Sequence, residues 1–186
     1  MSNKIQPIIP RTQENVLIRD LDEKDIPLIV SSFKSIGWDK SSELFMQYLD
    51  DVQKNTREIW VAFIDEFFAG YITLSFFSLY KPFRDKNIPE IMDLNVLPAF
   101  RNNGIGSLLI HTAEIKASTQ SNIVGIGVGL YAGTDGGYGA AQRLYVKLGY
   151  IPNGKGVAYQ YKNAIPGDYY KLDDDLVLWL TKTLSS

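Results

Sequence analysis

Cysteine is absent from the 186-residue sequence, and histidine occurs once, as His111. Without cysteine the chain can form no disulfide, no cysteine-ligated zinc site and no thiol nucleophile. A single histidine cannot supply a histidine cluster, so we expect no metal cofactor. No apolar run approaches the ~18 residues of a membrane-spanning helix, and the N-terminus lacks the apolar core of a signal peptide. These absences predict a cytoplasmic protein without a membrane partner.

The sequence also lacks a strong excess of charge of one sign. Its net charge is −2, and its lysine and arginine residues form no dense block. Phosphate contacts require clustered basic side chains, so we expect no nucleic-acid partner. A hydrophobic fraction of 45% is ordinary for a globular protein, and a chain of this length most simply forms one domain. We expect that domain over residues 14–186, after an N-terminal tail of residues 1–13.

The most informative stretch runs from residue 90 to residue 117. An apolar run ends at Pro98, a short loop carries Arg101, Gly104 and Gly106, and a segment of helical apolar periodicity follows. The first turn of a helix leaves backbone N–H groups unpaired and carries partial positive charge. Glycine lets a phosphate approach this backbone closely, and arginine suits phosphate oxygens. The stretch therefore has the chemistry of an anion site, although an ordinary strand–helix turn would show the same glycines.

Two common nucleotide-binding patterns are missing from this stretch and from the rest of the chain. No G-x-x-x-x-G-K-[ST] segment occurs, so a P-loop site is unsupported. Leu109 stands where the third glycine of a dinucleotide-binding G-x-G-x-x-G pattern would follow Gly104 and Gly106.

A larger pattern surrounds the two glycines. Val96-Leu-Pro-Ala-Phe-Arg101-Asn-Asn-Gly104-Ile-Gly106 resembles motif A of the GCN5-related N-acetyltransferase (GNAT) superfamily, V-x-P-x-x-R-x-x-G-[IV]-G. A second block, from Ala141 to Tyr150, resembles motif B of that family, A-x-x-L-Y-x-K-x-G-[FY]. The blocks occur in family order, and the resemblance covers roughly residues 16–184.

The resemblance implies both a fold and an activity. The fold is a mixed α/β (α+β) arrangement with a mostly antiparallel central sheet of about seven strands, flanked by about four helices. The sheet splays around acetyl-CoA, commonly at a bulge in the central strand. The implied function is direct transfer of the acetyl group from acetyl-CoA to a primary amine of an unidentified small-molecule or peptide acceptor. The alternative is a non-catalytic acyl-CoA-binding regulatory module.

The resemblance also assigns the cofactor site to particular residues. It implies that backbone groups near Leu94, Val96 and Leu97 pair with the pantetheine arm. Tyr138 stands where family members often carry asparagine, which puts one expected cofactor hydrogen bond in doubt. The pyrophosphate is placed on the loop and the first helical turn, at Arg101, Asn102, Asn103, Gly104, Ile105, Gly106 and Ser107.

Acetyl transfer from a thioester to an amine requires a base, polarisation of the carbonyl and a proton for the thiolate. A backbone N–H near Val96 could polarise the carbonyl. Because the family places a motif B tyrosine near the sulfur, Tyr145 is the candidate general acid and a cofactor contact; the alternative is a core tyrosine. Glu90 and Asp93 are candidate bases on the central strand, or they bind acceptor charge or support a loop. His111 is expected to be structural or exposed.

Periodicity and turn residues predict the order of the elements. We expect helices over residues 22–36, from Ser41 or Ser42 through Val52, and over residues 105–117 and 138–148. We expect strands over residues 16–20, 58–64, 68–77, 90–97, 122–131 and 176–180, with one more after Tyr150. The loops over residues 78–88, 132–139 and 152–170 are expected to determine the acceptor.

Three further segments have more than one interpretation. Glycines 125, 127 and 129 alternate along one strand, which indicates either tight packing or space for a ligand. The acidic triplet 173–175 is expected to be a solvated strand entrance rather than a metal cluster. Strand 176–180 is expected to be buried in the core, with a homodimer contact as the alternative.

Overall fold

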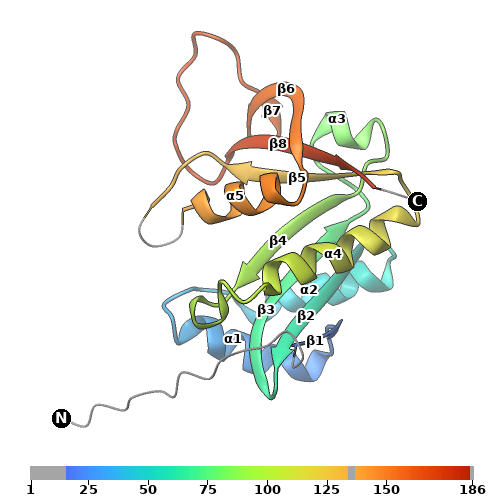
Figure 1. Ribbon diagram of the computed structural model, residues 1–186, viewed down its shortest axis with the longest axis vertical. Helices are drawn as coiled ribbons and strands as arrows, with labels where there is room; N and C mark the ends of the chain where they lie inside the picture. Colours follow the sequence, from blue (N-terminus) through green and yellow to red (C-terminus); the bar gives the residue numbers. More distant parts are fainter. Residues whose placement is uncertain (1–15, 134–136, 185–186) are drawn as a thin grey trace, which may run out of the picture.

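The computed structural model describes residues 16–133 and 137–184. Within these residues, eight strands form one sheet in the order β1-β2-β3-β4-β5-β8-β6-β7 (Figure 1). Only the β4–β5 pair is parallel among the described pairs; the others are antiparallel. The strands are β1 Val16–Asp20, β2 Arg57–Ile64, β3 Phe67–Ser75, β4 Glu90–Val96, β5 Ile123–Gly129, β6 Ile151–Tyr159, β7 Lys162–Asn163 and β8 Leu176–Thr183.

The sheet agrees with the sequence prediction in type and nearly in size. The eighth strand is β7, which has only two residues and pairs with the end of β6. A two-residue strand has no detectable apolar alternation, so the sequence could not predict it. The expected tail of residues 1–13 lies outside the described residues.

Five α-helices accompany the sheet in the described part of the chain, one more than expected. Helices α1 and α2 lie on one face of the β1–β4 half and α4 lies on the other, while α5 lies beside β5 (Figure 1). The unexpected helix is α3, a single turn inside the segment predicted as a loop. The bounds are α1 Ile26–Lys34, α2 Ser42–Gln53, α3 Lys81–Arg84, α4 Ile105–Ser118 and α5 Gly139–Lys147.

The first predicted helix is divided in two in the structure. Asp22 caps a 3-10 turn, Glu23–Asp25, and Asp25 bonds back to the Asp22 backbone N–H in a capping box. Helix α1 starts only at Ile26, with Pro27 in its first turn, where proline is tolerated. The boundary moves because the Asp22 cap and the proline each begin their own helical segment.

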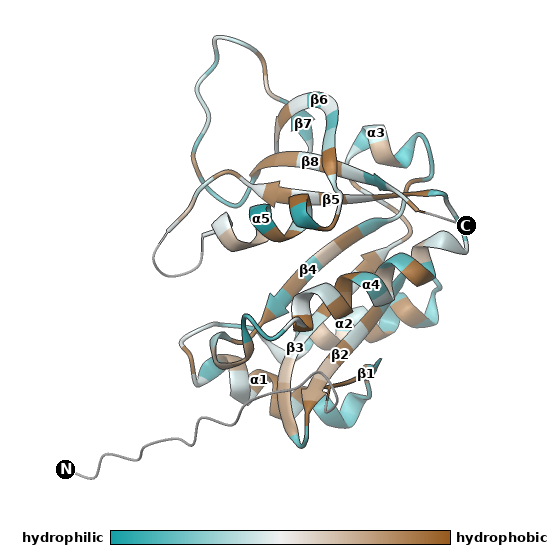
Figure 2. Cartoon of the chain, viewed as in Figure 1, coloured by the Kyte–Doolittle hydropathy of each residue, from teal (hydrophilic) through white to brown (hydrophobic). Residues whose placement is uncertain are grey.

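Aromatic side chains fill the space between α1, α2 and the sheet. Tyr71 on β3 contacts Phe33, Phe45 and Tyr48 at ring-centroid distances of 5.8, 5.3 and 6.4 Å. Hydrophobic residues run along the strands in Figure 2. A smaller buried cluster at the far end of the sheet contains Tyr80, Phe83, Ile88, Ala158 and Trp179.

Strand β4 bulges and then separates from β5. Its register on β3 pairs Thr73 with Met92 and Tyr71 with Asn95. Two residues of β4, Asp93 and Leu94, therefore lie opposite Ile72 alone, and Asp93 has φ of 52°. On its other edge, β4 pairs with β5 only at Glu90–Gly125 and at the next residue pair. The expected bulge and splay are confirmed. The bulge also places Met92 and Asp93 against the same side chain, Arg57.

Strand β8 lies inside the sheet, between β5 and β6. Trp179 and Leu180 are each 3% exposed, so this strand is buried as the main interpretation predicted. A homodimer stays a prediction. No helix in the described part of the chain has the length and hydropathy needed to cross a bilayer.

Candidate active site

A cleft of about 1030 Å³ lies where β4 and β5 separate. It is lined by the whole of β4, the loop before α4, the first turn of α4, and parts of α5 and β8. All three candidate catalytic residues and most candidate cofactor residues line it. These are Glu90, Asp93, Leu94, Val96, Arg101, Asn102, Gly104, Ile105, Gly106, Ser107 and Tyr145.

The start of α4 leaves backbone donors free at the cleft wall. Gly104 is the N-cap with φ of 79°, a left-handed conformation that favours glycine, and no side chain caps the helix. A Cβ on Gly106 would lie 3.2 Å from Leu144 Cδ2 and 3.9 Å from Leu94 Cδ2. The glycine therefore lets α4 start close to both β4 and α5, with its N–H groups directed at the cleft.

Arg101 is held in place at the edge of this helix start. Its Nε donates to the Val96 carbonyl oxygen at 3.0 Å, and its guanidinium lies 5.5 Å from the Trp38 ring centroid. Asn103, in contrast, does not line the cleft. Its Nδ2 donates to the carbonyl oxygens of Phe100 and Arg101, at 3.3 and 3.1 Å, and so fixes the loop.

The backbone of β4 beyond the bulge offers one free edge. The Leu97 N–H donates to the Ala69 carbonyl oxygen on β3 at 2.9 Å, and Leu97 does not line the cleft. Because successive N–H groups of a strand face opposite edges, the Val96 N–H faces away from β3, toward the cleft. Val96, rather than Leu97, is the residue whose backbone can meet a ligand there.

Glu90 is a buried carboxyl group at the inner end of the cleft. It is 3% exposed, and its Oε2 accepts a hydrogen bond from Ser78 Oγ. Burial raises the pKa of Glu90 from its ordinary 4.5 to about 7, against smaller opposing effects of the Ser78 hydrogen bond and Arg57. A carboxyl group that titrates near neutral pH can both take and return a proton under working conditions.

Asp93 lies in a different environment, within a polar network between α2 and the sheet. Its Oδ2 accepts from Tyr48 Oη at 2.9 Å and from Thr73 Oγ1 at 3.3 Å, and it lies 3.8 Å from Arg57 Nη1. Arg57 in turn contacts Asp51 at 3.2 Å. The network holds the bulge in place. It gives the Asp93 carboxylate three polar partners, whereas the Glu90 carboxyl group has a hydrogen bond from Ser78.

Tyr145 belongs to the core and to the cleft wall at the same time. It is 6% exposed, its ring lies 6.1 Å from that of Tyr150, and burial raises the pKa of its hydroxyl. The hydroxyl makes no hydrogen bond with any described residue. The interpretation as a core tyrosine is therefore confirmed, while the general-acid role stays a prediction for a residue that also lines the cleft.

Tyr138 and Asp174 lie together in the far wall of the cleft, a neighbourhood that the sequence did not indicate. Tyr131 and Tyr138 both donate from Oη to Asp174 Oδ1, at 2.7 and 2.9 Å. The two-residue turn of Gln160 and Tyr161 also reaches the cleft, with φ of 48° and 64°. Only tertiary structure brings these residues together, and no motif or local spacing in the sequence could have found Asp174, Gln160 or Tyr161.

Aromatic rings lie against the alternating glycines of β5. A Cβ on Gly125 would be 2.1 Å from the Phe83 ring, and one on Gly129 would be 2.4 Å from the Tyr138 ring. At Gly127 the nearest atoms would be the Trp179 ring and Val177, at 3.0 Å. Tight packing therefore explains the glycines, and the rings occupy the space that side chains would fill.

The described residues contain no group of three or more histidine, cysteine, aspartate or glutamate residues placed to hold a metal. His111 is exposed on α4, 4.0 Å from Glu114 Oε2. The roles assigned to individual site residues, and the expectation of no metal, stay predictions.

Comparison with known proteins gives a family and a set of similar folds. Residues 26–150 match the model of the acetyltransferase (GNAT) family, over more than half of the chain. No curated protein sequence matches the chain. Among solved structures, an N-acetyltransferase from Staphylococcus aureus Mu50 has a TM-score of 0.67 at 18% identity, covering 92% of this chain and 99% of that one.

Two other solved structures have similar scores. A putative acetyltransferase from Salmonella typhimurium, with its cofactor acetyl-CoA, has a TM-score of 0.65 at 16% identity, covering 92% of this chain and 95% of that one. A ribosomal-protein-alanine N-acetyltransferase from Brucella melitensis has a TM-score of 0.64 at 21% identity, covering 90% and 99%. At these identities the likeness shows the fold.

Proposed function

The chain belongs to the acetyltransferase (GNAT) family, and from that premise we propose that it is an acetyl-CoA-dependent N-acetyltransferase. It transfers the acetyl group directly to a primary amine of a small-molecule or peptide acceptor, in the cytoplasm and without a metal. The observation that carries the proposal is a buried carboxyl group, Glu90, that titrates near pH 7 in the cleft lined by the α4 start and Tyr145.

The residues at the start of α4 fit the phosphates of coenzyme A. The first-turn N–H groups lack a side-chain cap, and the helix dipole adds partial positive charge at this position. Arg101 is held by the Val96 carbonyl oxygen through Nε, which leaves the rest of its forked guanidinium for phosphate oxygens. Acetyl-CoA supplies the acetyl thioester, and the free edge of β4 holds its arm.

Three groups of the chain then carry the proton and charge transfers. Glu90 accepts the proton of the attacking amine, because its carboxylate is buried and gains from neutralisation. The Val96 N–H stabilises the negative charge that develops on the carbonyl oxygen. Burial keeps the Tyr145 hydroxyl protonated, so that it can donate a hydrogen bond, and then its proton, to the negative charge that develops on the departing sulfur.

Asp93 has a supporting position in this scheme. Its contacts with Tyr48, Thr73 and Arg57 fix the β4 bulge, and the bulge sets the edge at which Val96 meets the thioester. The proposal therefore assigns the base to Glu90 and the shape of the site to Asp93.

Calorimetric titration of acetyl-CoA into wild type and Arg101→Ala tests the cofactor site. Arg84→Ala is a matched control. Like Arg101, Arg84 donates one hydrogen bond to a carbonyl oxygen five residues earlier, but it does not line the cleft. We expect micromolar binding by wild type and the control, weakened at least about tenfold in Arg101→Ala. A folded wild type that does not bind acetyl-CoA would refute the proposal.

A screen of primary amines monitored by thiol release then tests the transfer itself. Acetyl-CoA binding without acceptor-dependent thiol release from any amine class would favour the non-catalytic binding module instead. Undiminished turnover by Glu90→Gln would refute the assignment of Glu90 as the base but would leave the acetyltransferase proposal standing.

A further inference from the structure

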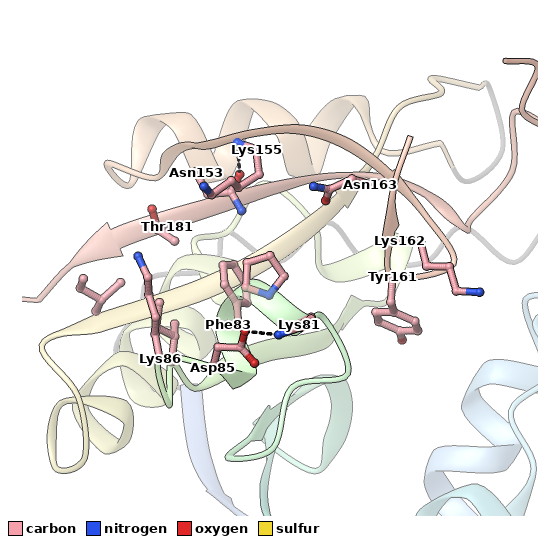
Figure 3. Close-up of a pocket in the computed structure, with 13 residues that line it drawn as sticks. Lys81, Phe83, Asp85, Lys86, Asn153, Lys155, Tyr161, Lys162, Asn163 and Thr181 are labelled. Atoms are coloured by element: carbon pink, nitrogen blue, oxygen red, sulfur yellow. Dashed lines mark hydrogen bonds and ion pairs between the residues drawn. The ribbon is translucent and has the colours of Figure 1, made fainter. Parts of the chain in front are cut away.

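A second cavity, of about 690 Å³, lies beside α3, away from the start of α4. Residues of α3 and the turn after it form one side, and residues of β6, β7 and β8 form the other (Figure 3). Tyr161 lines this cavity and also the main cleft. The cavity is therefore a separate space that touches the proposed active site through one side chain.

The floor of this cavity is apolar and well supported. Phe83 is 1% exposed and Ile88 is 6% exposed, and Pro82 and Ile123 complete the surface. The Phe83 ring is confined from below by Gly125, where an added Cβ would be 2.1 Å away. The floor is thus a preformed surface that can receive an apolar group without rearranging.

The rim of the cavity carries an excess of positive charge. Four lysines line it against one carboxylate, Asp85, which is paired with Lys81. The other three make no ion pair with any described residue, and all three are exposed. They are Lys86, Lys155 and Lys162.

Neutral hydrogen-bonding groups lie between these cations and the floor. Asn153 is fixed at both ends of its amide, since Nδ2 donates to Tyr80 Oη at 3.2 Å and Oδ1 accepts from the Lys155 N–H at 2.9 Å. Thr181 lines the cavity between Lys86 and Asn153 in Figure 3. From the floor outward the cavity therefore presents apolar carbon, then polar groups, then ammonium groups without an ion pair among the described residues.

We propose that this cavity binds a small organic anion with an apolar body. The body packs on Phe83, Ile88 and Ile123, and the anionic group is held by Lys86 and Lys155. A neutral ligand would gain only the apolar contacts, while an inorganic anion would gain only those with exposed, hydrated lysines. The combination of both surfaces selects an amphiphilic anion.

Calorimetric titration with 1-naphthyl phosphate tests this site, with 1-naphthol as the neutral probe. Both titrations are carried out without and with excess coenzyme A, which fills the main cleft. The test variant is Lys86→Ala/Lys155→Ala, and the control is Lys24→Ala/Lys34→Ala, which removes two exposed lysines elsewhere. Because all four side chains are exposed, neither double variant should unfold the protein.

We expect saturable 1:1 binding of 1-naphthyl phosphate to wild type and to the control. Binding should be at least about tenfold weaker in Lys86→Ala/Lys155→Ala, and at least about tenfold weaker for 1-naphthol. Absence of saturable binding at millimolar probe would overturn the proposal. So would equal affinity in the test variant, or competition by coenzyme A, which would locate the probe in the main cleft. These outcomes do not depend on whether the protein transfers an acetyl group.

Discussion

Replacement of Glu90 by glutamine should change how stability depends on pH. The pKa of Glu90 rises from 4.5 in an exposed chain to about 7 in the folded protein because the group is buried. A raised carboxyl pKa means that the folded state binds more protons than the unfolded state between these values. The stability contributed by the protonated group is complete below about pH 4.5 and is lost as pH rises through about 7.

The size of this effect follows from the difference between the two pKa values. At about 1.4 kcal/mol per pKa unit, the difference corresponds to about 3 kcal/mol in the free energy of unfolding. Most of it, about 2–3 kcal/mol, falls between pH 5 and pH 8. Glutamine keeps an oxygen that can accept from Ser78 Oγ and has no charge to bury, so Glu90→Gln should lack this loss.

Urea unfolding of wild type and Glu90→Gln at several pH values between 5 and 8 measures the difference directly. Asp93→Asn serves as the control carboxyl substitution on the same strand, and we expect it to lower stability without removing the pH dependence assigned to Glu90. If the free energies of unfolding of wild type and Glu90→Gln change with pH in parallel across this range, burial of Glu90 does not cause the pH dependence, and the prediction is refuted.

The same pair of variants separates the two candidate bases in catalysis. The rate of thiol release, as kcat/KM, should rise with pH to a plateau above about 7, as Glu90 loses its proton. Glu90→Gln should lower kcat/KM by roughly 10²–10⁴-fold and remove this inflection, whereas Asp93→Asn should keep it. An inflection that persists in Glu90→Gln and disappears in Asp93→Asn would transfer the base to Asp93.

Three further substitutions test other parts of the structure. Tyr145→Phe should bind acetyl-CoA as wild type does in calorimetry but release thiol about 10²-fold more slowly, and full turnover would remove the general-acid assignment. Gly125→Ala forces a methyl group into the Phe83 ring and should lower the urea unfolding free energy by about 1–3 kcal/mol, whereas Gly139→Ala, with an ordinary 3.5 Å contact, should be neutral or slightly stabilising. Lys182→Ala removes the ion-pair partner of the Glu114 carboxylate, which is 9% exposed, and leaves it the hydrogen bond from Tyr150 Oη. The change should cost about 2–3 kcal/mol in the same urea assay; no loss would show that water solvates this carboxylate.

The sequence predicted the elements whose signals are local. The β2–β3 hairpin, the Ser41 cap of α2 and the glycine start of α4 depend on residues within one turn or strand, and each is where it was expected. The one-turn helix α3 was missed because four residues cannot show a helical period. The division at Ile26 was missed because the Asp22 capping box and Pro27 were interpreted as one helix start.

The candidate site likewise contains residues that the sequence could predict and residues that it could not. Motif residues such as Arg101 and Tyr145 follow from the resemblance to motifs A and B, and they line the cleft together. Asp174, Gln160 and Tyr161 come from segments with no motif, and only the sheet order β5-β8-β6 brings them to the cleft. Similarly, no sequence pattern could have ranked Glu90 above Asp93, because the difference lies in burial and in the partners supplied by α2 and β3.

The position of Glu90 connects its chemistry to the splayed sheet. It pairs with Gly125 in one of only two residue pairs that join β4 to β5. The pairing buries the carboxyl group and so raises its pKa, while the separation of the strands just beyond opens the cleft that it faces. A longer ladder would bury Glu90 without access, and a shorter one would expose it and return its pKa toward 4.5. The Phe83 ring packs against Gly125, so a glycine required for packing and a candidate catalytic carboxyl group belong to the same residue pair, Glu90–Gly125.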